Sequence, residues 1–285
     1  MTLKLIKPDQ NVIYDISNAV ESVTWSGSIL SAGRSVEFTV LNDPYDSGLK
    51  IPAACVGDYI SFLVGSEELF YGQIFSIERS TAIGTVTYTA YDMMKNLLES
   101  NGRYNFKNTT PEAIAAQVLA DIQVPYNHLE PTGINIKSMI CDSKAFYDII
   151  MGAYTQAYRI TGNRYLPMIW QRAFGVWPAV YTVGNFTLSD ELNVAAASIS
   201  ETMDVKIYYD KGNQVGEIKD DTSLQKFGTF QDVYTVEKGV DPTTAAKNML
   251  KVNPTQNISL SAIGDRNCLN GYSVAVKDAA TGLYG

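Results

Sequence analysis

The sequence predicts an α+β protein in which two similar β-barrel-like domains are separated by a helical α/β middle region. Apolar residues alternate with period 2 toward both ends of the chain and recur at helical spacing in the middle. In addition, two stretches, Asp58–Gly72 and Gly271–Gly285, align without a gap. We therefore divide the chain into an N-terminal β-barrel-like domain (1–92), a helical middle domain (93–168) and a second β-rich domain with one helix (169–285).

The N-terminal domain is rich in β-branched and aromatic residues, which is typical of strands. Four segments show this composition: VEFTVL (36–41), DYISFLV (58–64), LFYGQIFSIER (69–79) and TVTYTAYD (85–92). The segment STAIGT (80–85), with Gly84, fits a hairpin connection. Short strands at this spacing favour a small barrel or sandwich.

The first two helices of the middle domain are predicted from spacing and caps. Residues 91–102 place Met93, Met94, Leu97 and Leu98 at helical spacing, and Gly102 is expected to cap the C-terminus. The next helix is expected to begin with Thr109 or Thr110 as N-cap, followed by Pro111 in the first turn. Glu112 is placed to close a capping box with Thr109. The face of this helix that should be buried carries Ile114, Val118 and Ile122.

The third helix, within residues 143–163, is the most strongly patterned one. Ser143 is its expected N-cap. Its apolar stripe follows the i, i+3, i+4, i+7 spacing and consists of Phe146, Ile149, Ile150, Ala153, Tyr154 and Ala157. Such a stripe is typical of core packing, and a groove for a cofactor or partner is the alternative.

Strand patterns return in the second β-rich domain. They lie in AVYTV (179–183), VKIYYDKGNQVGEI (205–218) with a turn at 211–213, FQDVYTV (230–236) and NISLSAIGD (257–265). One helix interrupts them: Asp241 is its expected cap, Pro242 takes the first position, and Ala245, Ala246, Met249 and Leu250 follow at helical spacing. Residues 271–285 are predicted to form a hairpin.

The repeat predicts that the two β-rich domains are copies of each other. The aligned stretches share Tyr59/Tyr272, Tyr71/Tyr284 and Gly72/Gly285, and upstream of them lie two matching strand patterns, VEFTVLND (36–43) and ISLSAIGD (258–265). The first copy continues through two more strand segments, whereas the second ends. Because an exposed sheet edge is normally covered, we expect that the second domain lacks its final strands or that another chain fills the gap.

Composition narrows the classes of function. The net charge is -8, and the 22 Lys and Arg residues are scattered, which disfavours specific nucleic-acid binding. No apolar run is long enough for a membrane span, and no signal peptide is evident. The three cysteines, Cys55, Cys141 and Cys268, are far apart, so we expect buried free thiols instead of a zinc or redox site.

No motif points to catalysis, so we predict no catalytic, cofactor-binding or metal-binding residues. The one histidine, His128, lies between Pro125 and Pro131 and is expected to be an exposed loop residue. Phosphate-binding loops and a G-x-S-x-G motif are absent. Glycoside hydrolysis needs only two carboxylates, but the adjacent acidic pairs are better explained as solvated turns: Glu67–Glu68, Asp190–Glu191 and Asp220–Asp221. The 18 tyrosines suit cores and protein interfaces, with saccharide stacking as the alternative.

Six segments, taken in order, resemble the baseplate hub proteins of contractile phage tails and phage-tail-like bacteriocins, of the XkdQ/YqbQ family. They are VESVTWSGSILSAGRSVEFTVL, ELFYGQIFSIERS, YTAYDMMKNLLESNGRYNFKNTTPEAIA, YDIIMGAYTQA, VKIYYDKGNQVG and DPTTAAKNMLK. Residues 169–183 do not map onto the family. The family pattern continues with further strands beyond the last residue, which supports the expectation of an incomplete second barrel.

The resemblance implies a structural virion-assembly protein, not an enzyme, encoded by a phage, a prophage or a bacteriocin locus. It would be made in the bacterial cytoplasm and would lie in the baseplate of a virion or another contractile injection system. Three subunits with two barrels each would form a trimeric ring that matches a sixfold tail tube. The implied partners are a second and third copy, the tail tube protein, the spike protein and other baseplate proteins, with no membrane and no cofactor.

Two other functions remain open from the sequence. One is a tail-associated polysaccharide or cell-wall hydrolase, which the single histidine and the missing motifs disfavour. The other is a sugar-binding tail protein, which predicts aromatic residues exposed in a groove.

Overall fold

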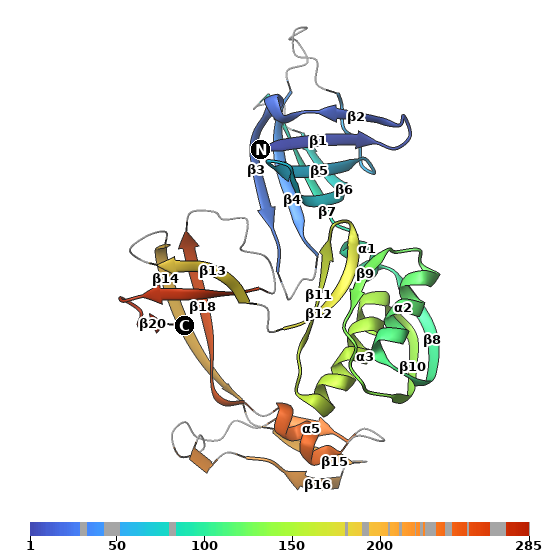
Figure 1. The fold of residues 1–285 in the computed structure, drawn as a ribbon, viewed down its shortest axis with the longest axis vertical. Helices are drawn as coiled ribbons and strands as arrows, with labels where there is room; N and C mark the ends of the chain where they lie inside the picture. The colour runs from blue at the N-terminus through green and yellow to red at the C-terminus, as the bar shows by residue number, and fades with distance from the viewer. Residues whose placement is uncertain are drawn as a thin grey trace.

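In the computed structural model the chain folds into an N-terminal sheet, an α/β middle body and a set of C-terminal strands with the short helix α5 (Pro242–Met249) (Figure 1). The described residues are 1–28, 33–42, 52–79, 84–179, 182–189, 194–204, 206–210, 213–219, 221–222, 225, 232–236, 241–249, 251–262 and 272–284.

The N-terminal sheet has seven antiparallel strands in the order β2-β1-β5-β6-β7-β4-β3. The strands are β1 (Thr2–Lys7), β2 (Val12–Asp15), β3 (Val20–Ser26), β4 (Ser35–Leu41), β5 (Tyr59–Val64), β6 (Glu67–Arg79) and β7 (Thr85–Tyr91), with a 3₁₀ turn at Ser17–Ala19. Alternate side chains are buried, so β4 contributes Val36, Phe38 and Val40 to the core. The period-2 pattern therefore predicted β4 to β7 correctly, while β1 to β3 were not among the segments it singled out.

Gly72 has a steric role in this sheet. A Cβ at this position would lie 2.3 Å from the backbone oxygen of Tyr91 and 2.5 Å from Cζ of Phe70. Because no real Cβ comes this close to a backbone atom, only glycine fits where β6 passes β7. This packing explains the glycine in the repeated Tyr-Gly pair; its counterpart, Gly285, lies outside the described residues.

The middle body contains more strand than the sequence predicted. Its elements are α1 (Met94–Glu99), β8 (Asn101–Thr109), α2 (Pro111–Asp121), β9 (Tyr126–Leu129), β10 (Ile136–Ala145), α3 (Phe146–Thr161), β11 (Tyr165–Trp170) and β12 (Ala173–Pro178). β8 pairs with β10, and a second sheet has the order β11-β12-β9. All three helices and both sheets share one core, into which α3 buries Ile149, Ile150, Ala153 and Tyr154. The stripe on α3 is therefore core packing, as the sequence favoured.

Two predicted caps are wrong because β8 and β10 occupy the residues concerned. Helix α1 ends at Glu99, and Gly102 lies in β8, where a Cβ would come within 2.5 Å of Cε1 of Phe146. Ser143 lies in β10 with φ 50°, at an irregularity between Cys141 and Lys144. Helix α3 instead begins after Ala145, without a side-chain cap.

The start of α2 is only partly as predicted. Thr110 is its N-cap and accepts a hydrogen bond from the backbone N–H of Ala113. The capping box with Thr109 is not formed, because Thr109 is the last residue of β8 and Glu112 accepts hydrogen bonds from the N–H and hydroxyl of Thr132. Glu112 thus ties the loop after β9 to α2.

Among the described residues of the C-terminal part, the elements include β13 (Thr182–Ser189), β14 (Val194–Asp204), β15 (Lys206–Asp210), β16 (Asn213–Glu217), β17 (Asp232–Thr235), α5 (Pro242–Met249), β18 (Lys251–Ala262), β19 (Ser273–Asp278) and β20 (Leu283–Tyr284). Its sheets have the orders β13-β19-β20, β14-β18 and β16-β15-β17.

The predicted start of α5 is confirmed, because Asp241 accepts a hydrogen bond from the N–H of Thr244 and Pro242 is the first helical residue. Ala245 and Ala246 are buried against Tyr234; Leu250 and the turn residues 211 and 212 lie outside the described part.

The two repeated stretches both fold into antiparallel hairpins, but with different surroundings. Tyr71 pairs with Ser61 across a short turn, whereas Tyr284 pairs with Lys277 across a longer one. Strand β5 lies antiparallel to β1, whereas β19 lies parallel to β13. A second barrel that copies the first is therefore not confirmed, and residues 263–271 lie outside the described part.

Candidate interaction sites

His128 has a structural environment. It lies in strand β9, so its predicted position in a loop is wrong, and its side chain is only half-exposed. Its Nε2 is 2.9 Å from Oε2 of Glu130, and its ring stacks on Trp177 with 5.5 Å between centroids. The stacking on Trp177 holds β9 against β12.

Among the described residues, no three His, Cys, Asp or Glu side chains gather as a metal ion would require. Cys141 is buried, which raises the pKa of its thiol, whereas Cys55 is exposed, contrary to prediction. Cys268 and the acidic residues Asp190, Glu191 and Asp220 lie outside the described part.

No helix among the described residues is long and apolar enough to cross a bilayer.

The first contact between the N-terminal sheet and the middle body is built on Arg172, at the tip of the β11–β12 hairpin (Figure 1). Gln171 and Arg172 form the two-residue turn with φ 49° and 63°. Positive φ at both positions matches the twist of a tight hairpin but disfavours residues other than glycine and asparagine. The turn holds this uncommon backbone while Arg172 projects toward the N-terminal sheet.

Arg172 makes a bidentate ion pair with Glu68 of β6. Its Nε donates to Oε2 over 2.7 Å and its Nη2 donates to Oε1 over 2.6 Å. Ser61 also donates to Glu68, over 2.5 Å. Burial alone would raise the pKa of Glu68, but the hydrogen bonds from Arg172 and Ser61 lower it below its ordinary value.

An aromatic pair completes this contact. The guanidinium of Arg172 lies 3.9 Å from the ring centroid of Tyr71, which stacks on Tyr59 at 5.3 Å. Arginine combines such stacking with a planar fork for a carboxylate, and lysine does not. We call Arg172, Glu68, Tyr71 and Tyr59 the Arg172 clamp.

Arg34 makes the second contact, and here the side chain comes from the N-terminal sheet and reaches the middle body. It is buried just before β4 and donates through Nη2 to the backbone oxygen of Ile169 in β11, over 2.5 Å. Its Nε forms an ion pair with the buried Asp92 at 3.2 Å, and Asp92 also accepts from the N–H of Met94 at the start of α1. Both contacts therefore grip the β11–β12 hairpin.

A third contact joins α3 to α5. The hydroxyl of Tyr158 donates to the backbone oxygen of Asn248 over 2.6 Å, and Nδ2 of Asn248 donates to the backbone oxygen of Arg159 over 2.9 Å. Arg159 also lies over the ring of Tyr234, 5.6 Å from its centroid. The C-terminal end of α3 is thus fixed to the C-terminal strands.

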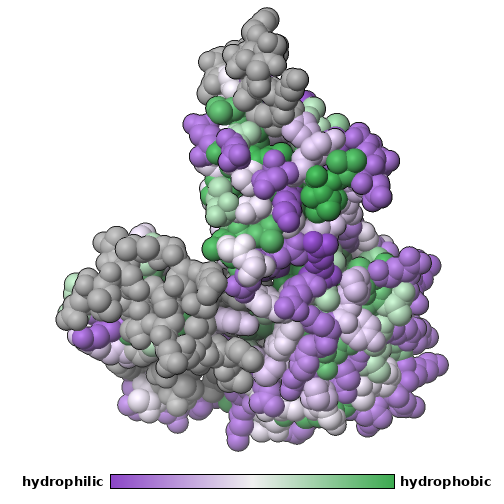
Figure 2. Space-filling model, turned by 45° about the horizontal axis from the view of Figure 1, so that its top comes forward, coloured by the Kyte–Doolittle hydropathy of each residue, from purple (hydrophilic) through white to green (hydrophobic). Residues whose placement is uncertain are grey.

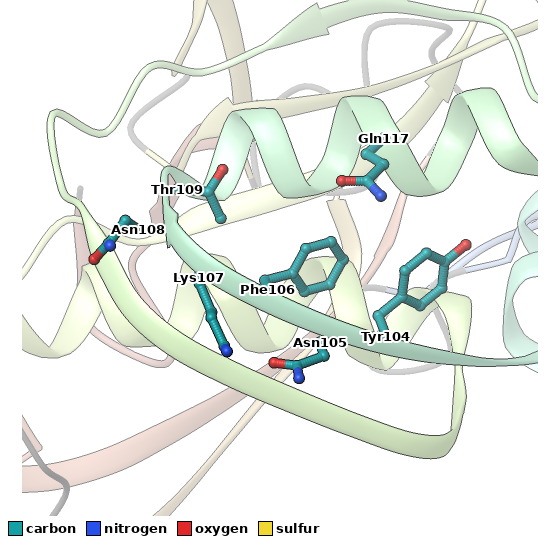
Figure 3. A pocket seen from close by; sticks show the side chains of 7 residues that line it. All are labelled: Tyr104, Asn105, Phe106, Lys107, Asn108, Thr109 and Gln117. Carbon is teal, nitrogen blue, oxygen red and sulfur yellow. The ribbon is translucent and has the colours of Figure 1, made fainter.

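An open hollow of ≈ 590 Å³ lies beside β8 (Figure 3). It is lined by Tyr104, Asn105, Phe106, Lys107, Asn108 and Thr109 of β8 and by Gln117 of α2. Tyr104 stacks on Phe106 with 5.2 Å between centroids, and its hydroxyl donates to Asp121. Burial, followed by the nearby Asp121 carboxylate, raises the pKa of Tyr104 to about 12.

The outer face of the N-terminal sheet carries apolar residues in register. Ile6 of β1 lies opposite Ile13 of β2 on one side and Tyr59 of β5 on the other. Ile13 is 63% exposed. Figure 2 shows apolar patches among hydrophilic ones over this sheet. This stripe runs toward the Arg172 clamp, through Tyr59.

Sequence reasoning assigned no residue to any of these contacts. Arg172 and Arg34 are single arginines without a motif, and their partners are distant in the chain. The only local signal was the tyrosine content of the β segments, which includes Tyr59 and Tyr71.

Comparisons with known proteins agree on the kind of protein. Residues 23–285 match the model of the family described as YQBQ-like. The phage-like element PBSX protein XkdQ of Bacillus subtilis (strain 168) is 29% identical over 231 residues, which cover 78% of this chain and 69% of that protein. These matches rest on sequence alone.

Solved structures share the fold. The 43 kDa tail protein of prophage MuSo2 from Shewanella oneidensis has a TM-score of 0.73 at 15% identity, covering 100% of this chain and 91% of its own. The tail protein from Neisseria meningitidis MC58 has a TM-score of 0.69 at 12% identity, covering 100% and 88%.

Proposed function

The chain belongs to the YQBQ-like family of phage tail proteins, and from this membership we propose that it is a structural hub of the baseplate in a contractile tail or tail-like particle. In this role it forms a trimeric ring, joins the tail tube to the central spike and contacts other baseplate proteins. It acts in the baseplate of a virion, prophage particle or bacteriocin after synthesis in the bacterial cytoplasm.

The family match over residues 23–285 is the observation that carries this proposal. The XkdQ relative belongs by name to a phage-like element, and the relatives with the same fold are tail proteins by name. A hub works through geometry, because symmetric interfaces bury surface and hold their neighbours at fixed angles. If the β-rich ends of the chain are copies, three subunits present six similar modules to a sixfold tube.

The contacts between the bodies of the chain support a scaffolding role. Arg172 and Arg34 hold the N-terminal sheet against the middle body, and Tyr158 holds the middle body against α5. A subunit whose parts are already oriented loses less conformational freedom on assembly. The relatives with the same fold are tail proteins by name, so we propose a structural role and not an enzymatic one.

Co-purification tests the proposal. The full chain is expressed alone and together with the tail tube and spike proteins encoded by the same phage, and each mixture is analysed by size-exclusion chromatography with light scattering. We expect a complex whose mass contains three copies of the chain. Persistent monomers in every mixture would contradict the hub. Clearing of a cell-wall zymogram by the pure chain would instead favour a hydrolase.

A further inference from the structure

We propose that the free edge of β8 binds an extended, acidic peptide segment of a partner protein as an additional strand. The first observation behind this proposal is the set of residues that line the hollow beside β8 (Figure 3). Successive side chains of a strand point to opposite faces, so a hollow on one face is lined by alternate residues. This hollow is lined by every residue from Tyr104 to Thr109. It therefore runs along the edge of the strand.

That edge is open among the described residues. β8 pairs only with β10 in a two-stranded sheet, with Phe106 opposite Met139 and Lys107 opposite Ser138. The backbone groups on the other side of β8 therefore lack a strand partner in the described part of the chain. Such an edge is a template for an added strand, and proteins that recognise peptides in this way use it for main-chain hydrogen bonds.

The charge of the sheet selects the occupant. The exposed residues of β8 and β10 include four cations, Arg103, Lys107, Lys137 and Lys144, against one carboxylate, Asp142, which is paired with Arg103 at 2.6 Å. This basic sheet stands on a chain with a net charge of -8. Lys107 is the one charged residue in the lining of the hollow. Acidic side chains on the incoming strand therefore meet a complementary surface.

The inner side of the hollow selects for apolar residues at alternate positions. Tyr104 and Phe106 stack there, and Gln117 of α2 closes the wall. An added strand directs alternate side chains toward this wall and the others toward Lys107. The matching segment is thus one in which apolar and acidic residues alternate. Six residues of β8 line the hollow, which corresponds to a strand of about 20 Å.

Binding of a labelled peptide to the full-length chain tests the edge. The probe is a fluorescein-labelled hexapeptide of alternating valine and glutamate, and its counterpart carries lysine in place of glutamate. Fluorescence anisotropy should show saturable binding of the glutamate peptide at low salt, weakening as salt rises. The lysine peptide should not bind. Absence of binding of the glutamate peptide at about 1 mM would overturn the proposal.

Two charge reversals localise the site. Lys107→Glu should weaken binding about tenfold, because it replaces an attraction with a repulsion at the hollow. Lys137→Glu is the matched control: it makes the same change on the neighbouring strand, at a position that does not line the hollow, and should weaken binding less than about threefold. Equal losses in both variants would assign binding to general charge and overturn the edge. Circular dichroism checks that both variants fold.

A second probe separates strand addition from other binding. The same glutamate peptide with an N-methyl group on every backbone nitrogen cannot donate main-chain hydrogen bonds and should lose binding. Undiminished binding of this peptide would contradict an added strand. Competition by soluble cell-wall glycan fragments, with Tyr104→Ala abolishing it, would make the hollow a saccharide site and overturn the proposal.

The inference rests on the proposed function only for the source of the segment, which would be a neighbouring protein of the particle. A chain that binds the peptide but never assembles with tube or spike would fail as a hub and keep its edge site. A chain that assembles with these proteins but does not bind the peptide would keep the hub role and lose the proposed edge site.

Discussion

Arg172 shows how much a single residue can contribute when its backbone and side chain are both constrained. Its positive φ orients it, and two charge-assisted hydrogen bonds and a tyrosine ring fix its guanidinium. Arg103 makes an ion pair of equal length with Asp142, but both of those side chains are more than two-thirds exposed. Distance alone does not separate these two pairs; burial and the number of partners do.

Arg172→Ala should destabilise the docking of the N-terminal sheet by about 1–2 kcal/mol, after allowance for the half-exposed guanidinium. We expect the first thermal transition to fall by about 2–8 °C in differential scanning calorimetry. Arg103→Ala should leave that transition within about 1 °C. Equal shifts in both variants would mean that the clamp contributes no more than an exposed pair.

Gly72→Ala should destabilise the N-terminal sheet by about 3 kcal/mol or more, because the new methyl group meets the backbone oxygen of Tyr91. Gly152→Ala in α3 is the control: the nearest atom is the flexible Cε of Met139 at 3.3 Å, and alanine favours a helix by about 1 kcal/mol. Urea unfolding should therefore show a large loss for the first variant and no loss for the second. A neutral Gly72→Ala would remove the steric account of the Tyr-Gly pair.

Whole elements were predicted well where the apolar pattern was strong. The stripe on α3 and the alternation in β4 and β7 reappear as buried faces. Strand β8 was missed because NGRYNFKNT buries only Phe106 and otherwise carries polar residues that suit a loop. Ser143 looked like a cap because it precedes a helical pattern, yet Cys141 and Lys144 on either side of it pair with β8, and Ser143 itself takes φ 50° at the irregularity between them. Such pairing depends on residues far apart and leaves no local signature.

Tyr158→Phe tests the joint between α3 and α5. It removes the hydroxyl that donates to the backbone oxygen of Asn248, so α5 should exchange its amide hydrogens faster, by about fivefold for a loss of about 1 kcal/mol. Tyr147→Phe, on the same helix, is the control and should leave exchange in α5 unchanged. Hydrogen–deuterium exchange followed by mass spectrometry measures both. Unchanged α5 in the Tyr158 variant would show that this bond does not hold the joint.

At the scale of the whole molecule, docking should depend on pH through Glu68. Its pKa is lowered in the folded state, so its contribution is fully present above the ordinary value of 4.5 and is lost as the pH falls through the folded value. We expect the radius of gyration from small-angle X-ray scattering to increase when the pH is lowered from 6 to about 3. Arg172→Ala should show a smaller change, because its clamp is already open. An identical response in both proteins would assign the expansion to other carboxylates.

The family was recognisable from the sequence because many weak patterns occurred in the right order, and no single motif was needed. The repeat was less informative. The strands predicted within 58–79 and the hairpin predicted for 271–285 both form antiparallel hairpins where the structure describes them. The neighbours of each hairpin are set by strands elsewhere in the chain, and β13 and β1 run in opposite senses beside them. Short alternating segments encode a strand and a turn, not the sheet that they join.

The β11–β12 hairpin is gripped twice, by Arg172 at its tip and by Arg34 at Ile169. Rotation of the N-terminal sheet about either contact would break the other contact. The hairpin therefore fixes the orientation of the sheet relative to the middle body. A force applied to the N-terminal sheet is therefore transmitted through the hairpin to α3, which shares its core, and from α3 to α5.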